Sequence, residues 1–174
     1  VSSQDYSSIE IWYSRFHYNS ALVFGSDLNV DSIPLPSTPA LKLVGSVFDS
    51  GDTVLLQNPF GFIIARGNTF NHTSHGINSG SWVVLFGNLF NIEQNGDNRQ
   101  EKAGKPPSRP QAMCNDLDVN TFHSLGYNIS ADHSCVLDQA TDLPGTDPML
   151  ARNEDGLLVP QPGSPAIDSG PSEV

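Results

Sequence analysis

The chain has 174 residues, of which 37% are hydrophobic and only 16% are charged, and it contains 15 Gly and 13 Pro. This composition is too poor in charge for a disordered segment and too rich in turn-forming residues for a helical bundle, so it indicates an all-β domain with many short strands. Acidic residues outnumber basic ones by 19 to 8, and the net charge of −11 argues against nucleic acid and anionic lipid as partners. No apolar run of about eighteen residues occurs, so no membrane insertion is expected.

A repeat runs through the first ninety residues. Four segments align on a phenylalanine, with a small polar residue two positions earlier and apolar residues five and seven positions earlier. The four aligned residues are Phe16, Phe48, Phe70 and Phe90. Their template is apolar-x-apolar-x-Gly-(Asn/Ser)-x-Phe, with Tyr13 at the first Gly position. The later spacings of 22 and 20 residues match one rung of a parallel β-helix, so the sequence predicts about four rungs.

The template also predicts how successive rungs stack. The phenylalanines are expected to lie over one another, and Asn68 and Asn88 to form an amide ladder at the corner. The Gly positions supply the positive φ that such a corner requires. Short apolar runs at 21–23 and 54–56, and a weaker one at Ile77, are expected to form the second strand of each rung. The Pro-rich stretch 32–39 is expected to form a loop.

Alternation along the repeat places a set of mostly apolar side chains on one outer face. These residues are Trp12, Val44, Ile64, Arg66, Val84 and Phe86, with Glu10 and Lys42 beside them. Such a face is too apolar to be bare. Either the C-terminal half folds over it, or a partner chain or a sugar stacks on Trp12 and Phe86.

The chain changes character after this repeat. We expect β-helix rungs over 1–94, a polar Pro-rich loop over 95–112, and an irregular cap over 113–174 that packs on the β-helix. A disulfide between Cys114 and Cys135 would close a loop of about 22 residues, worth on the order of 3 kcal/mol. A metal or redox pair is the alternative, although no C-x-x-C spacing is present.

Three segments of the C-terminal region follow a familiar order: Ser124–Ile129, Thr146–Leu150 and Gly163–Gly170. Together with Cys135, they resemble the C-terminal end of secreted bacterial right-handed parallel β-helix proteins, which are pectin-lyase-like, of the choice-of-anchor Q type. The resemblance implies a right-handed β-helix and a secreted or cell-surface location. Because nothing ahead of Ile9 looks able to cover the first rung, we also expect this end to pair with another molecule.

Candidate chemistry is weak throughout. Lyases of β-helix architecture use a basic residue beside carboxylates, for which the candidates are Arg66, Lys42, Asp49 and Asp52. The segment containing Asp116, Asp118 and Asn120 imitates the start of a calcium loop but lacks its Gly and its Glu. No cofactor is therefore expected, and Ca²⁺ at this segment is the alternative. Asn71 and Asn128 lie in N-glycosylation sequons.

These observations favour a non-enzymatic extracellular domain acting in adhesion or cell-surface structure. Its expected partner is itself or another β-helix chain, joined end to end, and a filament is one outcome of such pairing. The alternative is a polysaccharide-binding or polysaccharide-cleaving module that uses the outer strand face.

Overall fold

The computed structural model describes residues 9–17, 22–25, 41–49, 54–57, 63–71, 77–79, 82–91, 114–116 and 122–171. These residues form strands and connecting segments without any helix, as the composition predicts. In this described part of the chain, no helix is available to cross a membrane.

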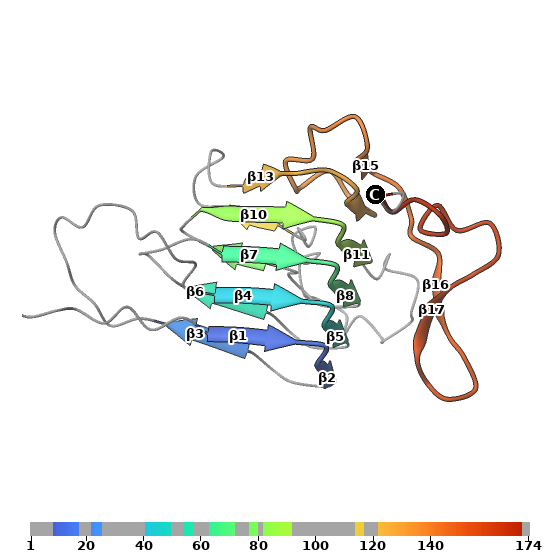
Figure 1. The fold of residues 1–174 in the computed structure, drawn as a ribbon, viewed down its shortest axis with the longest axis horizontal. Helices are drawn as coiled ribbons and strands as arrows, with labels where there is room; N and C mark the ends of the chain where they lie inside the picture. The colour runs from blue at the N-terminus through green and yellow to red at the C-terminus, as the bar shows by residue number, and fades with distance from the viewer. Residues whose placement is uncertain are drawn as a thin grey trace, which may run out of the picture.

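Three parallel sheets make up the body of the molecule (Figure 1). Sheet A contains, in spatial order, β1 (Ile9–Trp12), β4 (Leu41–Val44), β7 (Ile63–Arg66), β10 (Val83–Phe86) and β13 (Phe122–Ser124). Sheet B contains β2 (Arg15–His17), β5 (Val47–Asp49), β8 (Thr69–Asn71), β11 (Leu89–Asn91), β14 (Ile129–Ser130) and β15 (Leu143–Pro144). Sheet C contains β3 (Leu22–Gly25), β6 (Val54–Gln57), β9 (Ile77–Ser79) and β12 (Cys114–Asp116).

The chain visits sheets A, B and C in turn, and each strand pairs in parallel with the equivalent strand of the next repeat. We call the segments 9–25, 41–57, 63–79 and 83–116 repeats 1 to 4. Each repeat contributes three strands, where the sequence pattern indicated two. The difference lies at the corner after sheet A, where Gly67 and Gly87 both adopt φ 63° and separate one short strand from the next.

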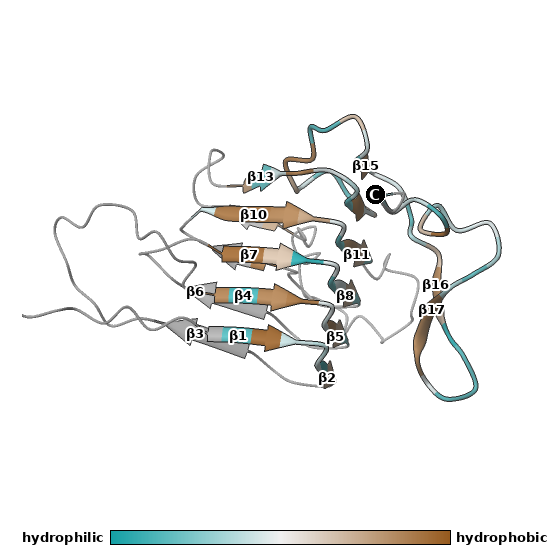
Figure 2. Cartoon of the chain, in the orientation of Figure 1, coloured by the Kyte–Doolittle hydropathy of each residue, from teal (hydrophilic) through white to brown (hydrophobic). Residues whose placement is uncertain are grey.

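The core lies between the sheets, and its most regular feature is a column of phenylalanines. Phe16, Phe48, Phe70 and Phe90 stack with ring centroids 5.0 Å apart and planes within 7° of parallel. The predicted column is therefore confirmed. Alternate residues of the sheet A strands also point inward, since Leu43, Ala65 and Leu85 have no exposed surface. Figure 2 shows mainly hydrophobic residues along these strands, with hydrophilic segments within β4 and at the end of β7.

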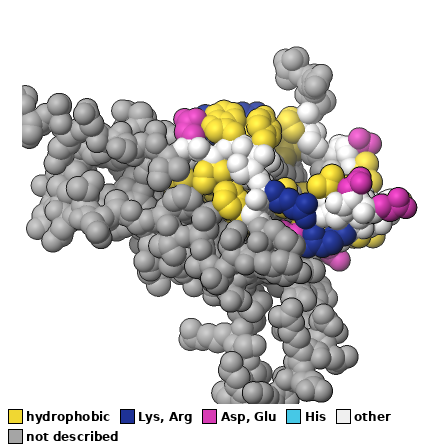
Figure 3. Space-filling view, turned by 90° about the horizontal axis from the view of Figure 1, so that it is seen from below, with side chains coloured by type: hydrophobic (Ala, Val, Ile, Leu, Met, Phe, Trp, Pro, Cys, Tyr) yellow, Lys and Arg dark blue, Asp and Glu magenta, His cyan; other side chains and the backbone are white. Residues whose placement is uncertain are grey.

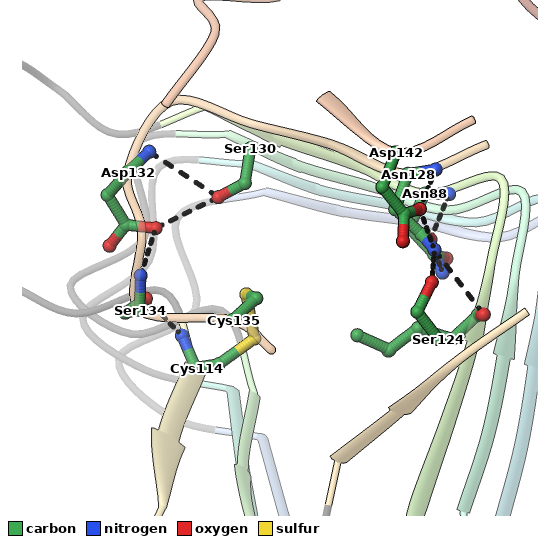
Figure 4. The surroundings of a disulfide bond; sticks show 10 residues. Asn88, Cys114, Ser124, Asn128, Ser130, Asp132, Ser134, Cys135 and Asp142 are labelled. Carbon is green, nitrogen blue, oxygen red and sulfur yellow. Dashed lines mark hydrogen bonds between the residues drawn. A yellow bond between two sulfur atoms is a disulfide. The ribbon is translucent and has the colours of Figure 1, made fainter. Parts of the chain in front are cut away.

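A hydrogen-bonded ladder fills the corner between sheets A and B. Both the backbone N and Nδ2 of Asn68 donate to Oδ1 of Asn88 at 3.0 Å, which confirms the predicted amide ladder. Asn88 donates in the same way to Oδ1 of Asn128, and Asn128 donates to Oδ1 of Asp142 (Figure 4). We call this set the corner ladder; its members are Ser14, Ser46, Asn68, Asn88, Asn128 and Asp142.

The sheets continue past Phe90, so the expectation that the repeat ends there is wrong. Strands β12, β13 and β14 pair with β9, β10 and β11 and add a further layer to each sheet. The sequence pattern missed this layer for two reasons. Its corner is one residue longer, since Leu85 and Leu89 align with Ser124 and Ile129, and Ser130 stands at the place of Phe90.

The remaining C-terminal segment closes one end of the stack and forms a hairpin. A disulfide joins Cys114 on β12 to Cys135, which confirms the predicted pairing (Figure 4). Cys135 and Leu137 are buried against the core. Farther on, β16 (Leu150–Arg152) and β17 (Leu158–Pro160) pair antiparallel. This hairpin lies beside the sheet B strands (Figure 1).

Candidate binding face

The outer face of sheet A carries two rows of side chains that the strand register brings into line. One row runs across β1, β4, β7 and β10, and the other continues onto β13. We call these residues the sheet A face: Trp12, Val44, Arg66 and Phe86 in the first row, and Glu10, Lys42, Ile64, Val84 and His123 in the second. The six residues that the sequence pattern placed on one outer face therefore lie together on this sheet.

Two cations of this face lie against aromatic rings. Lys42 Nζ lies 4.4 Å from the Trp12 ring centroid and 4.0 Å from Oε1 of Glu10. Trp12 Nε1 donates to Oε2 of Glu10 at 2.8 Å, so the indole is fixed from two sides. One strand pair away, the Arg66 guanidinium lies 5.1 Å from the Phe86 ring. Such cation–π contacts stabilise by about 0.5–1 kcal/mol each at exposed sites and hold the rings in fixed positions.

A second indole lies at the far side of the face. Trp82 immediately precedes β10, and its ring centroid is 4.6 Å from that of His123 on β13. Trp82 is 49% exposed and Trp12 is 45% exposed, so both indoles offer an open face to solvent. Trp82 and His123 were not among the residues that the sequence pattern placed on this face. Trp82 could have been found because it stands directly before an apolar template position, whereas His123 was missed because the repeat was thought to end at Phe90.

The described C-terminal hairpin docks on sheet B instead of covering the sheet A face. Arg152 on β16 donates from Nη2 to Oδ2 of Asp49 on β5 at 2.6 Å. Arg15 on β2 donates to the carbonyl oxygen of Gly156 in the hairpin turn at 2.8 Å. These contacts fix the hairpin beside the carboxyl end of β5 and the start of β2. The described hairpin therefore does not supply the cover over the outer face that the sequence left open.

The hairpin contact ends a second polar stack. Asn91 Nδ2 donates to Oδ1 of Asn71 at 2.7 Å, and Asn71 Nδ2 donates to Oδ1 of Asp49 at 2.8 Å. These three residues each follow a phenylalanine of the column, and that position is the sequence signal which could have revealed them. Because the side chain of Asp49 has no exposed surface, the guanidinium of Arg152 supplies the charge that a buried carboxylate needs.

The catalytic candidates do not come together. Lys42 and Arg66 lie on the sheet A face against aromatic rings, whereas Asp49 is buried at the end of a sheet B strand. Asp52 lies outside the described residues. No arrangement of a base beside carboxylates therefore forms from the described candidates.

The calcium and glycosylation candidates fare differently. Asp118 and Asn120 lie outside the described residues, and only the backbone of Asp116 is described, in β12. Where residues are described, no group of three or more His, Cys, Asp or Glu side chains is placed to hold a metal ion.

The two glycosylation candidates are wrong for this fold, because Asn71 is 1% exposed, Asn128 is fully buried, and both side-chain nitrogens donate hydrogen bonds. A glycan on either nitrogen would have to pass through the core.

Comparison of the chain with models of known families, with curated proteins and with solved structures finds no match.

Proposed function

We propose that the chain forms a right-handed parallel β-helix and acts as a non-enzymatic extracellular domain in adhesion or cell-surface structure. The observation that carries this proposal is the in-register stacking of three parallel sheets, with the phenylalanine column and the corner ladder running from repeat to repeat. A stack in which every repeat hydrogen-bonds to the next is stiff and presents a repeating outer surface. The disulfide fits an extracellular location, because disulfides persist in oxidising compartments.

The resemblance of the C-terminal segments to choice-of-anchor Q proteins supports the same proposal. All three of these segments have structural places among the described residues. Ser124–Ile129 forms the corner between β13 and β14, and Ser164 donates from its hydroxyl to the carbonyl oxygen of Pro148 at 2.7 Å, which joins the second segment to the third. We therefore propose that the resemblance reflects membership of that type.

The sheet A face is proposed as the adhesive surface. The Trp12 ring on this face is exposed but held by Glu10 and Lys42, so binding to it would cost little side-chain entropy. The same contacts argue against a catalytic role for Lys42 and Arg66, because each cation is already packed on a ring.

A polysaccharide-binding or polysaccharide-cleaving module is the second candidate. The observation that favours it is the pair of half-exposed indoles, Trp12 at the end of β1 and Trp82 directly before β10 of the same sheet. Flat indole surfaces combine an apolar face with a polar edge, and a sugar ring has the same character.

One experiment separates these roles. The full chain is passed over immobilised uronic-acid polymers and neutral polysaccharides, with and without Ca²⁺, while absorbance records any unsaturated product. We expect retention without turnover, weakened at least tenfold by Trp12→Ala and by Trp82→Ala. Ile167→Ala is the matched control, because Ile167 is a similarly exposed apolar side chain outside the sheet A face. Turnover that Arg66→Ala abolishes would show that the domain is an enzyme. Absence of retention on every polymer would exclude the polysaccharide role.

A further inference from the structure

Two pairs, each of one aromatic ring and one cation, follow one another along the sheet A face. Trp12 of β1 pairs with Lys42 of β4, and Arg66 of β7 pairs with Phe86 of β10. Trp12 and Arg66 stand at the same register position of strands two apart. Because neighbouring strands lie about 4.8 Å apart, these two residues are separated by about 10 Å along the stack, which is close to the length of two linked sugar rings.

The pair at β1 and β4 carries no net charge. Glu10 accepts a hydrogen bond from Trp12 Nε1 at 2.8 Å, and its other carboxylate oxygen lies 4.0 Å from Lys42 Nζ, so the carboxylate offsets the ammonium. Tyr13 extends the aromatic surface, because its ring centroid is 6.2 Å from that of Trp12 and the residue is 78% exposed. In Figure 3, which views the molecule from the β1 side, hydrophobic, acidic and basic side chains of the described residues meet along one edge. Such a surface fits a neutral sugar, whose apolar ring face covers the indole while its hydroxyls bond to the charged groups.

The pair at β7 and β10 is positively charged. The Arg66 guanidinium lies 5.1 Å from the Phe86 ring, and the Tyr127 ring meets the same phenylalanine edge to face, with centroids 5.7 Å apart. Arg66 is exposed, and among the described residues its guanidinium takes part in no ion pair and no hydrogen bond. Stacking uses only the face of the guanidinium. Its N–H edge is therefore available, and this planar edge matches the two oxygens of a carboxylate.

The difference between the two pairs restricts the charge pattern of a ligand. Trp12 and Arg66 are about two sugar rings apart, so a glycan that is acidic at every ring, or at every second ring, would place one carboxylate over Trp12 whenever another lies on Arg66. The carboxylate over Trp12 would face Glu10, in a chain whose net charge of −11 already repels polyanions. A neutral glycan would leave the N–H edge of Arg66 bonded only to water.

We propose that the sheet A face binds a sparsely charged acidic glycan, in which successive uronic acids are separated by at least two neutral sugars. The glycan lies across the strands along the first row of the face. Its carboxylate accepts two hydrogen bonds from the Arg66 guanidinium, and a neutral sugar stacks on Trp12. Arg66 is then the residue that selects the ligand, and Phe86, held by Tyr127, positions the guanidinium. This inference rests on the proposed polysaccharide-binding role of the face and names the chemistry of its ligand.

Calorimetric titration of the full chain with four oligosaccharides of about eight sugars tests the charge pattern. A gellan oligosaccharide has one glucuronic acid in each four-sugar repeat, and its carboxyl-reduced form is neutral. A hyaluronan oligosaccharide is acidic at every second sugar, and an oligogalacturonate is acidic at every sugar. The gellan oligosaccharide should bind about tenfold more tightly than each of the other three, because it alone combines a hydrogen-bonded charge pair at Arg66 with a neutral sugar on Trp12.

Substitutions on the face test the residues. Arg66→Gln should reduce the affinity for the gellan oligosaccharide to that of its carboxyl-reduced form, and should leave the affinity for the reduced form unchanged. Phe86→Leu, which removes the ring beneath the guanidinium, should also weaken only the acidic ligand. Trp12→Ala should weaken both ligands by the same factor. Arg15→Gln is the matched control and should change neither affinity, because Arg15 is an exposed arginine on sheet B.

Three results would overturn the inference while leaving the polysaccharide role of the face in place. They are equal affinity for the gellan oligosaccharide and its carboxyl-reduced form, binding of the hyaluronan or galacturonate oligosaccharide as tight as that of gellan, and a gellan affinity that Arg66→Gln leaves unchanged. Binding of none of the four oligosaccharides would overturn the inference and the polysaccharide role together.

Discussion

Each amide of the corner ladder is needed for both its oxygen and its nitrogen. Asn88 accepts two hydrogen bonds from Asn68 and donates to the carbonyl oxygen of Ala65 and to Oδ1 of Asn128, all within a buried site. Because leaving a buried partner unsatisfied costs about 1–3 kcal/mol, the chemistry of this one side chain affects three neighbours. The ladder therefore restricts which side chains its positions tolerate by their hydrogen-bonding groups, as the hydrophobic core does by side-chain volume.

We predict that substitutions of Asn88 lower the free energy of unfolding in a graded order. Asn88→Ser, which imitates Ser46 at the same corner, should lose about 1–2 kcal/mol, and Asn88→Ala about 3 kcal/mol. Asn88→Asp should be the most harmful, because a buried carboxylate would face the oxygens of Ala65 and Asn128 without a proton to donate. Urea unfolding measures the three variants.

The control for the charge that Asn88→Asp introduces is the opposite substitution, made at the aspartate that ends the ladder. Asp142→Asn keeps the oxygen that accepts from Asn128 and disturbs only the contact with the backbone N of Gln139, so about 1 kcal/mol should be lost. An Asn88→Asp variant as stable as Asp142→Asn would show that the direction of the ladder has no energetic meaning.

The ladder also illustrates what the sequence could and could not reveal at the residue scale. Asn68 and Asn88 were predictable because they recur at one template position, twenty residues apart. Asn128 was not, since one extra residue in its corner shifts it out of the template, and its Asn-x-Ser context suggested a glycan instead. Asp142 has no template around it at all. Its place depends on how the chain returns over the end of the stack, which no local pattern records.

At the scale of elements, the β16–β17 hairpin is held by an ion pair between residues 103 positions apart. Nothing in the sequence near Arg152 or Asp49 indicates this contact, because it depends on how the hairpin returns to sheet B. The sheet A strands of the four repeats were predictable for the opposite reason. Their apolar alternation, and the glycine corners of repeats 2 to 4, are local features, and the stacking follows from repetition.

We predict that the hairpin contact depends on Arg152 much more than on Arg15. The two side chains are 37% and 39% exposed, yet their Nη2 atoms lie 2.6 and 3.9 Å from Oδ2 of Asp49. Arg152→Met should lower the free energy of unfolding by about 2 kcal/mol, because it removes the close partner of a buried carboxylate, while Arg15→Met should cost below about 1 kcal/mol. Urea unfolding measures stability, and hydrogen exchange of the Ala151 amide reports release of the hairpin.

A second substitution checks the cause. Asp49→Asn in the Arg152→Met background should recover most of the lost stability, since a neutral amide needs no buried counter-charge. Equal losses of unfolding free energy for Arg152→Met and Arg15→Met would contradict a special role for the close pair of Arg152 and Asp49.

The disulfide is the other element-scale constraint, since it joins β12 to the segment that covers the core. The Cys114→Ala and Cys135→Ala double variant should lose about 3 kcal/mol, because the bond closes a loop with a sequence separation of 21. Thermal unfolding with and without reductant provides the measurement. The wild type should fall to the melting temperature of the double variant on reduction, and the double variant should not change. A wild type whose melting temperature stays unchanged when the disulfide is fully reduced would contradict the prediction.

At the scale of the whole molecule, the stack behaves as a series of layers that contact only their neighbours. Interior layers pack between two neighbouring layers, whereas repeat 1 has one neighbour among the described residues. The contribution of a layer to the free energy of unfolding should therefore depend on its position along the stack. The phenylalanine column allows this variation to be measured, because the same residue type stands at the same position in each layer. Phe70 stacks on Phe48 and on Phe90 and has no exposed surface, whereas Phe16 stacks on Phe48 and is partly exposed.

This difference between Phe70 and Phe16 yields a prediction about the stability of single-residue variants. Phe70→Ala should lower the free energy of unfolding by about 4 kcal/mol, because it leaves a cavity between two rings. Phe16→Ala should cost about half as much, since its outer side borders no layer in the described chain. Urea unfolding of the two variants gives the comparison, with Phe48→Ala expected to match Phe70→Ala. If Phe16→Ala proved as costly as Phe70→Ala, the first layer would already be covered in the isolated chain. The expected difference between Phe16 and Phe70 would then lose its physical basis.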